Sequence, residues 1–211
     1  MQVTDSTGDD GIDFKLLADL AAGAEDAFVE LYRRRQPDVY RFAFAMARSR
    51  TFAQDVTQEV FLNVLENAAR FDGAKGSVRA WLFGCARHKI LDRLRLERRW
   101  TDAMPPEAAE FDHDERLHAD QRVERLHAAL ARLPIEYREA LVLCEIQELS
   151  YAETAGVLGC PLGTVRSRLH RGRALLLVLL DETAEAAVDG SAPADAAACA
   201  AATLRTWEVC S

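Results

Sequence analysis

The stretch that decides the fold is SYAETAGVLGCPLGTVRSRLHRGR, residues 150–173. Ser150 and Glu153 form a capping box for a short helix, and Gly159 supplies a left-handed end to it. Pro161 then opens a second helix, which is rich in arginine and has no acidic residue before Arg173. A short capped helix, a tight turn and a longer basic helix form a helix-turn-helix. The sequence therefore predicts a unit that binds duplex DNA.

The second helix of this unit has two faces. When successive residues are placed ~100° apart, four of the polar residues from Arg166 to Arg171 share an arc of about 140°. Guanidinium groups on such an arc can donate to guanine edges and phosphates, although an ordinary solvated basic face is the alternative. The predicted DNA contacts are Thr164, Arg166, Ser167, Arg168, His170 and Arg171. The residues predicted to pack inward are Leu162, Val165, Leu169, Gly172 and Leu176.

Helical periodicity also runs through most of the chain upstream. No segment alternates polar and apolar residues as a half-buried strand does, so the fold class is all-α. We expect Asp13 to cap a first helix that ends at Gly23, and a second helix to begin near Ala24. Pro37 predicts a break in this second helix.

Two more helix starts complete this upstream block. Thr51 and Gln54 predict a capping box. Ser77, after the loop 73–76, predicts the cap of a helix that continues to Arg99. These helices make one domain over residues 13–99. A helix over about 118–132, and another after Pro134, lead into the helix-turn-helix.

Charge is distributed unevenly along the chain. Fifteen basic and seven acidic side chains give residues 31–100 a net charge of +8, although the whole chain carries −8. The acidic segments flank two basic or neutral blocks, which predicts two small helical domains joined by an extended acidic linker. The predicted divisions are an acidic lead-in 1–12, a helical bundle 13–99, a linker 100–117, a helix-turn-helix domain 118–180 and an Ala-rich extension 181–211.

The helix after Thr51 is apolar on two sides. One apolar arc can bury the helix in its own domain and consists of Phe52, Val56, Val60 and Val64. The opposite side interleaves leucines with polar groups, which favours a protein partner over complete burial. The predicted docking residues are Gln54, Asp55, Gln58, Glu59, Leu62 and Leu65.

The helix after Ser77 combines a packing side with a cationic side. Its apolar residues are Trp81, Leu82, Ala86, Ile90 and Leu94, and its basic residues are Arg79, Arg87, His88, Lys89, Arg93 and Arg95. Behind a glycine-containing loop, this arrangement suits single-stranded nucleic acid, with the loop lining a pocket for an unstacked base. The alternative is a core tryptophan with solubilising arginines, and the apolar spacing favours the core position for Trp81.

Several classes of protein are disfavoured. The chain has no apolar run long enough to span a membrane and no signal peptide, so we expect a cytoplasmic protein. Its five cysteines lack metal-site spacing, so no metal or cofactor is expected, and no role is predicted for Cys199 and Cys210 in the extension. A helical enzyme or metal sensor that uses His113, His118, His127 and the cysteines is a minor alternative, because their spacings place no nucleophile beside a base and no ligand set on one helix face.

Several motifs occur together in one order. They are QDVTQEVF at 54–61, FDG at 71–73, RAWLF at 79–83, LP at 133–134, YR at 137–138, LSYAE at 149–153 and GTVRSRLHR at 163–171. With this set the chain closely resembles the extracytoplasmic-function sigma factors of the sigma-70 family over about residues 13–180. A typical short member stops soon after Leu180, so the extension departs from the pattern.

The resemblance implies a function without catalysis. The bundle would correspond to sigma region 2 and the helix-turn-helix to region 4, with core RNA polymerase (its β′ clamp helices and β flap) and promoter DNA as partners. The docking residues would contact the clamp helices, the helix-turn-helix would bind the −35 element, and the linker would thread towards the polymerase active site. An anti-sigma factor is a possible further partner. The residues implied for the melted −10 element are Asp72, Lys75, Ser77, Arg79, Arg87, His88 and Arg93.

One alternative from the residues alone is an autonomous helix-turn-helix repressor or activator. Such a protein usually binds its operator as a dimer and needs no surface for polymerase. The second apolar side around Leu62 and Leu65 argues against it.

Overall fold

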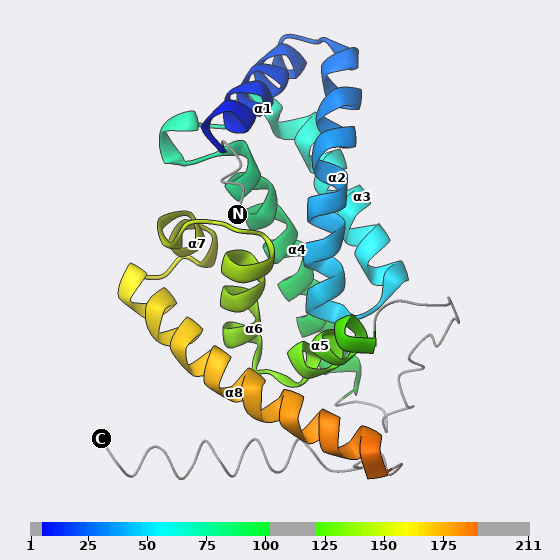
Figure 1. The fold of residues 1–211 in the computed structure, drawn as a ribbon. Helices are drawn as coiled ribbons and strands as arrows, with labels where there is room; N and C mark the ends of the chain where they lie inside the picture. The colour runs from blue at the N-terminus through cyan, green and yellow to red at the C-terminus, as the bar shows by residue number, and fades with distance from the viewer. Residues whose placement is uncertain (1–5, 102–120, 190–211) are drawn as a thin grey trace.

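Helices make up the fold that the computed structural model describes, over residues 6–101 and 121–189 (Figure 1). Within those ranges there is no strand, in agreement with the all-α prediction. The first two residues of the predicted linker, 100–101, belong to the last helix of the first block, whereas residues 102–117 and the cysteines of the extension lie outside the described residues. The first block contains α1 (Ser6–Ala21), α2 (Glu25–Ala47), α3 (Arg50–Asn67), the short turns η1 (Ala68–Arg70) and η2 (Gly73–Lys75), and α4 (Val78–Thr101). The second contains α5 (Gln121–Arg132), α6 (Ile135–Leu141), the π-helical turn η3 (Val142–Ile146), α7 (Tyr151–Leu158) and α8 (Leu162–Asp189).

The first block is built around α2. Helices α1, α3 and α4 all pack against it, and large apolar side chains fill the space between them. Phe42 of α2 meets Phe83 of α4 edge to face, with ring centroids 5.4 Å apart, and both rings are fully buried. Phe61 of α3 is buried in the same core. This packing fixes α3 and α4, which carry the predicted docking and cationic residues.

The role predicted for Asp13 is wrong. Helix α1 begins at Ser6, so Asp13 lies inside it and caps nothing. Its carboxylate is fully buried and accepts hydrogen bonds from the Nε atoms of Arg34 (3.0 Å) and Arg35 on α2. A buried carboxylate needs such partners, because the removal of an unpaired charge from water costs on the order of several kcal/mol. Asp13 therefore holds α1 against α2.

Two further boundary predictions are wrong. Pro37 lies in the middle of α2, which continues through it to Ala47. Neighbouring helices on several sides of α2 offset the ~3 kcal/mol that an internal proline costs. The N-cap of α3 is Ser49, whose hydroxyl accepts from the Phe52 amide at 3.2 Å, so Thr51 is already inside the helix. By contrast, the predicted end of the first helix at Gly23 and the start of the second near Ala24 are confirmed.

The second block packs α5, α6 and α7 against one long helix, α8 (Figure 1). A glycine permits the closest approach: a Cβ placed at Gly172 would lie 3.1 Å from Leu141 Cδ1 and 3.3 Å from Tyr137 Cβ. Helix α8 does not stop near Leu180 but continues to Asp189. Arg132 of α5 binds Glu182 of this continuation at 2.7 Å, which ties the extended part of α8 to the block.

The two blocks lie against each other. Helices α5 and α6 contact α2, and α7 contacts α4. Arg138 of α6 donates to the carbonyl of Met46 at the end of α2, and Arg48 pairs with Glu124 of α5 at 2.9 Å. A single hydrophobic core therefore continues from one block into the other.

Candidate nucleic-acid interface

The helix-turn-helix predicted from the sequence is present in α7 and α8. The Ser150 hydroxyl accepts from the Glu153 amide at 3.2 Å, and the Glu153 carboxylate accepts from the Ser150 amide at 3.0 Å, which completes the capping box. Gly159 ends α7 with φ of 64°, a left-handed conformation that favours glycine. The carbonyl of Pro161 then accepts the first amides of α8. Local sequence thus sets the angle at which α8 leaves the turn.

The first half of α8, residues 162–173, is the recognition helix of this unit. Val165 and Leu169 are buried on its inner side, where Gly172 is buried with them. Leu162 departs from its predicted inward position and is 37% exposed, because it lies at the first position of α8, beyond the turn. The outer side carries Arg166, Ser167, His170 and Arg171, all exposed, while Thr164 and Arg168 lie at its edges and are half-buried.

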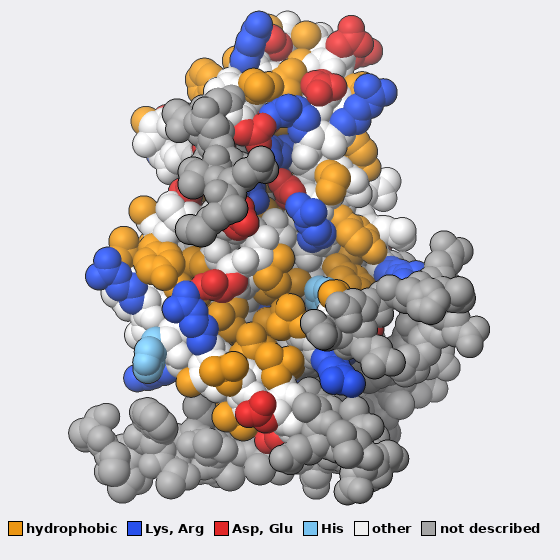
Figure 2. Space-filling view, in the orientation of Figure 1, with side chains coloured by type: hydrophobic (Ala, Val, Ile, Leu, Met, Phe, Trp, Pro, Cys, Tyr) orange, Lys and Arg blue, Asp and Glu red, His pale blue; other side chains and the backbone are white. Residues whose placement is uncertain are grey.

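Except for Arg173, the cations of the recognition helix have no carboxylate partner among the described residues. Within the described residues, no carboxylate forms an ion pair with Arg166, Arg168, His170 or Arg171, and the pair that Glu145 makes is with Arg173. The Ser167 hydroxyl donates to the Thr164 carbonyl at 2.9 Å. In Figure 2, basic side chains and a histidine lie along this part of α8, and an acidic side chain lies close to them. The recognition helix therefore presents guanidinium groups at Arg166, Arg168 and Arg171 that form no ion pair within the described residues, whereas Arg173 at its end is paired.

The loop before α4 is shaped by its own polar groups. Asp72 accepts from the Ala74 amide at 3.0 Å, and Gly76 has φ of 145°, in the region that favours glycine. The Ser77 hydroxyl accepts from the Ala80 amide at 3.2 Å, which confirms it as the cap of α4. The loop therefore has a defined conformation where it meets the first turn of α4.

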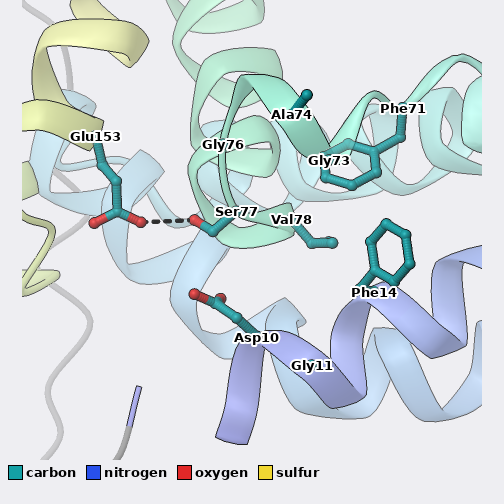
Figure 3. Close-up of a pocket in the computed structure, with 10 residues that line it drawn as sticks. All are labelled: Asp10, Gly11, Phe14, Phe71, Gly73, Ala74, Gly76, Ser77, Val78 and Glu153. Carbon is teal, nitrogen blue, oxygen red and sulfur yellow. Dashed lines mark hydrogen bonds between the residues drawn. The ribbon is translucent and has the colours of Figure 1, made fainter. Parts of the chain in front are cut away.

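A hollow of about 670 Å³ lies beside this loop (Figure 3). Phe14 of α1 and Phe71 of the loop line it as a tilted aromatic pair with centroids 6.2 Å apart. The ring centroid of Trp81 lies 5.5 Å from that of Phe71, and Trp81 is half-buried. An aromatic wall in a hollow of this size can stack an unstacked base.

Two carboxylates, however, also line the hollow. Figure 3 shows Asp10 from α1 and Glu153 from α7 at one end of it. Burial raises the pKa of Asp10, and the nearby charge of Glu153 raises it further. Glu153 also accepts a hydrogen bond from Ser77 at 2.7 Å. Sequence reasoning missed Asp10 and Phe14, because no motif links the first helix to a loop some sixty residues later.

The cationic face of α4 and its loop comprises Lys75, Arg79, Arg87, His88 and Arg93, and each of them contacts a carboxylate. The pairs are Lys75 with Asp72 (3.5 Å), Arg79 with Asp38 (3.6 Å), Arg87 with Glu139 (2.9 Å), His88 with Asp92 (3.2 Å), and Arg93 with Asp55 (3.2 Å) and Glu59. The structure thus brings all five predicted cations together with acids rather than leaving them open.

The pair between Arg87 and Glu139 joins the two blocks. Arg87 donates from Nε to Glu139 Oε1 at 2.9 Å and from Nη2 to Oε2 at 3.2 Å, a two-point contact of the kind that a phosphate also makes. Glu139 is 2% exposed, and burial raises its pKa while Arg87 opposes that shift. A carboxylate of the second block therefore takes two hydrogen-bond donors of an arginine on the cationic face.

The docking face is the exposed side of α3 and comprises Gln54, Asp55, Gln58, Glu59, Leu62 and Leu65. Leu62 is 53% exposed and Leu65 is 46% exposed, whereas the apolar arc of Phe52, Val56, Val60 and Val64 is buried as predicted. Sequence reasoning missed a neighbouring part of this surface on α2. There Val29 and Tyr32 are exposed, and the Tyr32 ring lies 4.8 Å from the buried Phe61 ring.

Sites of other kinds are not found in the described ranges. No cluster of three or more histidine, cysteine or acidic residues there could hold a metal ion. None of the helices there is long and apolar enough to cross a bilayer.

Comparisons with known proteins agree with both halves of the chain. A family model of sigma-70 region 2 matches residues 31–100, and one of sigma-70 region 4 matches residues 123–176. The ECF RNA polymerase sigma factor SigE of Mycolicibacterium smegmatis is 39% identical over 173 residues, which are 75% of this chain and 65% of that relative, just under two thirds of its length. The ECF sigma factor SigC of Mycobacterium tuberculosis is 35% identical over 83% of this chain and 95% of its own.

Two solved structures are similar to the chain over most of its length. CnrH in complex with the cytosolic domain of CnrY has a TM-score of 0.65 and 29% identity, over 81% of this chain and 98% of that one. The sigma factor RpoE in complex with the anti-sigma factor NepR from Bartonella quintana has a TM-score of 0.64 and 25% identity, over 75% and 98%.

Proposed function

Because the chain belongs to the extracytoplasmic-function sigma factors of the sigma-70 family, we propose that it binds core RNA polymerase and directs it to promoters with paired −10 and −35 elements. In this role it has no catalytic centre of its own and acts in the cytoplasm, where the polymerase is. Its contribution is to hold polymerase and promoter at once.

The observation that carries this proposal is the presence of two separate exposed surfaces. The recognition helix offers unpaired arginines, which suit the −35 element in duplex form. The docking face on α3 offers Leu62 and Leu65 among acidic and amide groups, which suits the clamp helices of the polymerase. An autonomous repressor would need the first surface but not the second.

The −10 element is assigned to the cationic face and the adjacent hollow. Phe14 and Phe71 would stack a base flipped out of the melted strand, and Arg87 and Arg93 would contact its phosphates. These groups are paired or partly covered in the closed arrangement. The second block, with Glu139 and Glu153, therefore has to move away before the −10 strand can enter.

An anti-sigma factor is a further proposed partner. Two solved relatives are recorded in complexes, CnrH with CnrY and RpoE with the anti-sigma factor NepR. The likeness extends over 75% or more of this chain, so a comparable protein could hold the two blocks together and keep the −10 face covered.

The assignment of the docking face is tested with Leu62→Arg. We expect this variant to lose co-purification with core RNA polymerase, because a charge would have to be buried against the partner. Ala18→Arg, which adds the same charge at an exposed position of α1, is the matched control and should bind polymerase normally. Duplex binding, measured by fluorescence anisotropy on sequences enriched with the wild-type chain, should be unchanged in both variants.

Two results would overturn the assignment. If Leu62→Arg keeps its affinity for polymerase, the docking face lies elsewhere. If it loses both polymerase and duplex binding, Leu62 supports the fold rather than a contact.

A further inference from the structure

The docking face and the cationic face share a ladder of ion pairs. Asp55 and Glu59 are one turn apart on α3, and Lys89 and Arg93 are one turn apart on α4. Arg93 donates from Nη1 to Asp55 Oδ2 at 3.2 Å and from Nη2 to Glu59 Oε1, and Lys89 Nζ lies 3.4 Å from Glu59 Oε2. Two carboxylates assigned to polymerase therefore hold Arg93 of the face assigned to DNA, and Glu59 also holds the adjacent Lys89.

The contacts of Arg93 give its guanidinium a defined position. Its central carbon lies 5.6 Å from the centroid of the Phe52 ring, in a cation–π contact. The hydrogen bond from Arg93 is the main cause that lowers the pKa of Glu59, and the same bond raises the pKa of Arg93. The pair thus stabilises both charged forms and consumes the donors that a phosphate would need.

The same acids are open to a partner from the outside. The side chain of Asp55 is 51% exposed and that of Glu59 is 36% exposed, whereas that of Arg93 is 28% exposed. Asp55 and Glu59 stand at helical spacing with Leu62, so a protein that covers Leu62 also reaches both carboxylates. Basic groups on that protein would compete with Arg93 for them.

We propose that Asp55 and Glu59 act as a relay, in which polymerase docking on α3 takes these carboxylates and releases Arg93 and Lys89 to bind the phosphates of the melted promoter strand. This inference rests on the proposed function and adds a coupling between its two surfaces. Linkage makes the coupling reciprocal: whatever frees the acids from Arg93 must also favour docking. The chain would therefore bind the −10 strand most tightly when it is bound to the polymerase.

The relay makes an unusual prediction for Arg93→Gln. Removing the guanidinium frees Asp55 and Glu59 in advance, so polymerase no longer has to displace it. We expect the free full-length variant to bind core RNA polymerase about two- to fivefold more tightly than the wild type, the range set by one or two exposed ion pairs. Lys89→Gln, which frees only Glu59, should give a smaller gain in affinity. Titration of fluorescently labelled protein with core polymerase measures both.

Arg95→Gln is the matched control. It removes the same charge from the same helix, but Arg95 pairs with Asp92 and not with the docking face. Its affinity for polymerase should equal that of the wild type, which separates the relay from a general effect of net charge. Thermal unfolding of each variant checks that the fold is intact, and Lys89→Gln carries the test if Arg93→Gln unfolds.

The outcomes are distinguishable. Tighter binding of Arg93→Gln and Lys89→Gln, with Arg95→Gln unchanged, supports the relay. Affinities equal to or weaker than that of the wild type overturn the relay and leave the docking assignment standing. A wild-type chain that does not bind core polymerase at all overturns the proposed function itself.

Discussion

The two surfaces assigned to DNA differ in the state of their cations. The recognition helix of α8 carries two exposed arginines, Arg166 and Arg171, that no carboxylate of the described residues pairs with. The cationic face of α4 and its loop has each of its five basic side chains against an acid, and in the second block Glu139 contacts Arg87 and Glu153 contacts Ser77. One surface is ready for duplex DNA, whereas the other must exchange partners first.

The difference reflects the two tasks. A −35 element is double-stranded before initiation, so a preformed helix face can bind it directly. A −10 strand becomes available only when the duplex melts, and an unpaired cationic groove would attract nucleic acid non-specifically before that. Under the proposed assignment, pairing with internal acids would lower such binding until polymerase and promoter are both present.

The largest effect that separates the two surfaces is expected from Arg87→Met. It leaves Glu139 buried without its partner and should lower the free energy of unfolding by about 2 to 4 kcal/mol. Arg166→Met on the recognition helix removes an unpaired, exposed cation and should change it by less than about 0.5 kcal/mol. Urea unfolding followed by circular dichroism measures both. Equal effects from the two arginines would remove the distinction.

A double substitution checks the cause. Arg87→Met combined with Glu139→Leu removes the uncompensated charge, so most of the lost stability should return. If the double variant is as unstable as Arg87→Met, the loss comes from packing around Arg87 and not from the stranded carboxylate.

An intermediate effect is expected on DNA. Arg166→Ala should cost about 1 to 3 kcal/mol of discrimination at one base pair of the −35 element if the guanidinium contacts a base edge. Competition binding with single-base variants of an enriched duplex measures this loss. Uniform weakening on every sequence would instead assign Arg166 to a phosphate.

The smallest effect concerns one half-buried histidine. His127 of α5 lies edge to face on Phe44 of α2, with centroids 5.4 Å apart, and burial lowers its pKa below 6.5, with a smaller contribution from Arg48 and an opposing one from Glu124. A depressed folded-state pKa contributes stability that is present above about pH 6.5 and is lost as the pH falls through the folded value. Unfolding free energies should therefore drop by up to about 1 kcal/mol between about pH 7.5 and pH 5.5.

The matched control lies on the recognition helix. His127→Gln should flatten this pH dependence, whereas Arg166→Gln, at an exposed position of α8, should leave it unchanged. Unfolding curves at several pH values decide between them, and an unchanged pH dependence in His127→Gln would contradict the account.

Local signals in the sequence predicted the recognition unit well. The capping residues bond to groups within four or five positions along the chain, so their spacing alone indicated the caps. They are Ser150 with Glu153, Gly159 and Ser77. The outward position of Arg166 followed from helical periodicity in the same way.

Interactions between distant residues explain the failures. Asp13 looks like a cap, but its true partners are Arg34 and Arg35, more than twenty residues away. Pro37 looks like a break, but packing of other helices around α2 keeps the helix continuous. The acids that cover the cationic face behave likewise, since Glu139 is 52 residues from Arg87. Neither the spacing of residues nor the composition of the sequence predicts such pairs.

The most direct test of the central claim is reconstituted transcription. Core RNA polymerase, with and without the purified chain, is given fragmented genomic DNA from the source organism, and the 5′ ends of the transcripts are mapped. We expect new start sites that depend on the chain and share two upstream motifs at constant spacing. No new start sites, or only a reduction of those made by core polymerase alone, would contradict the account.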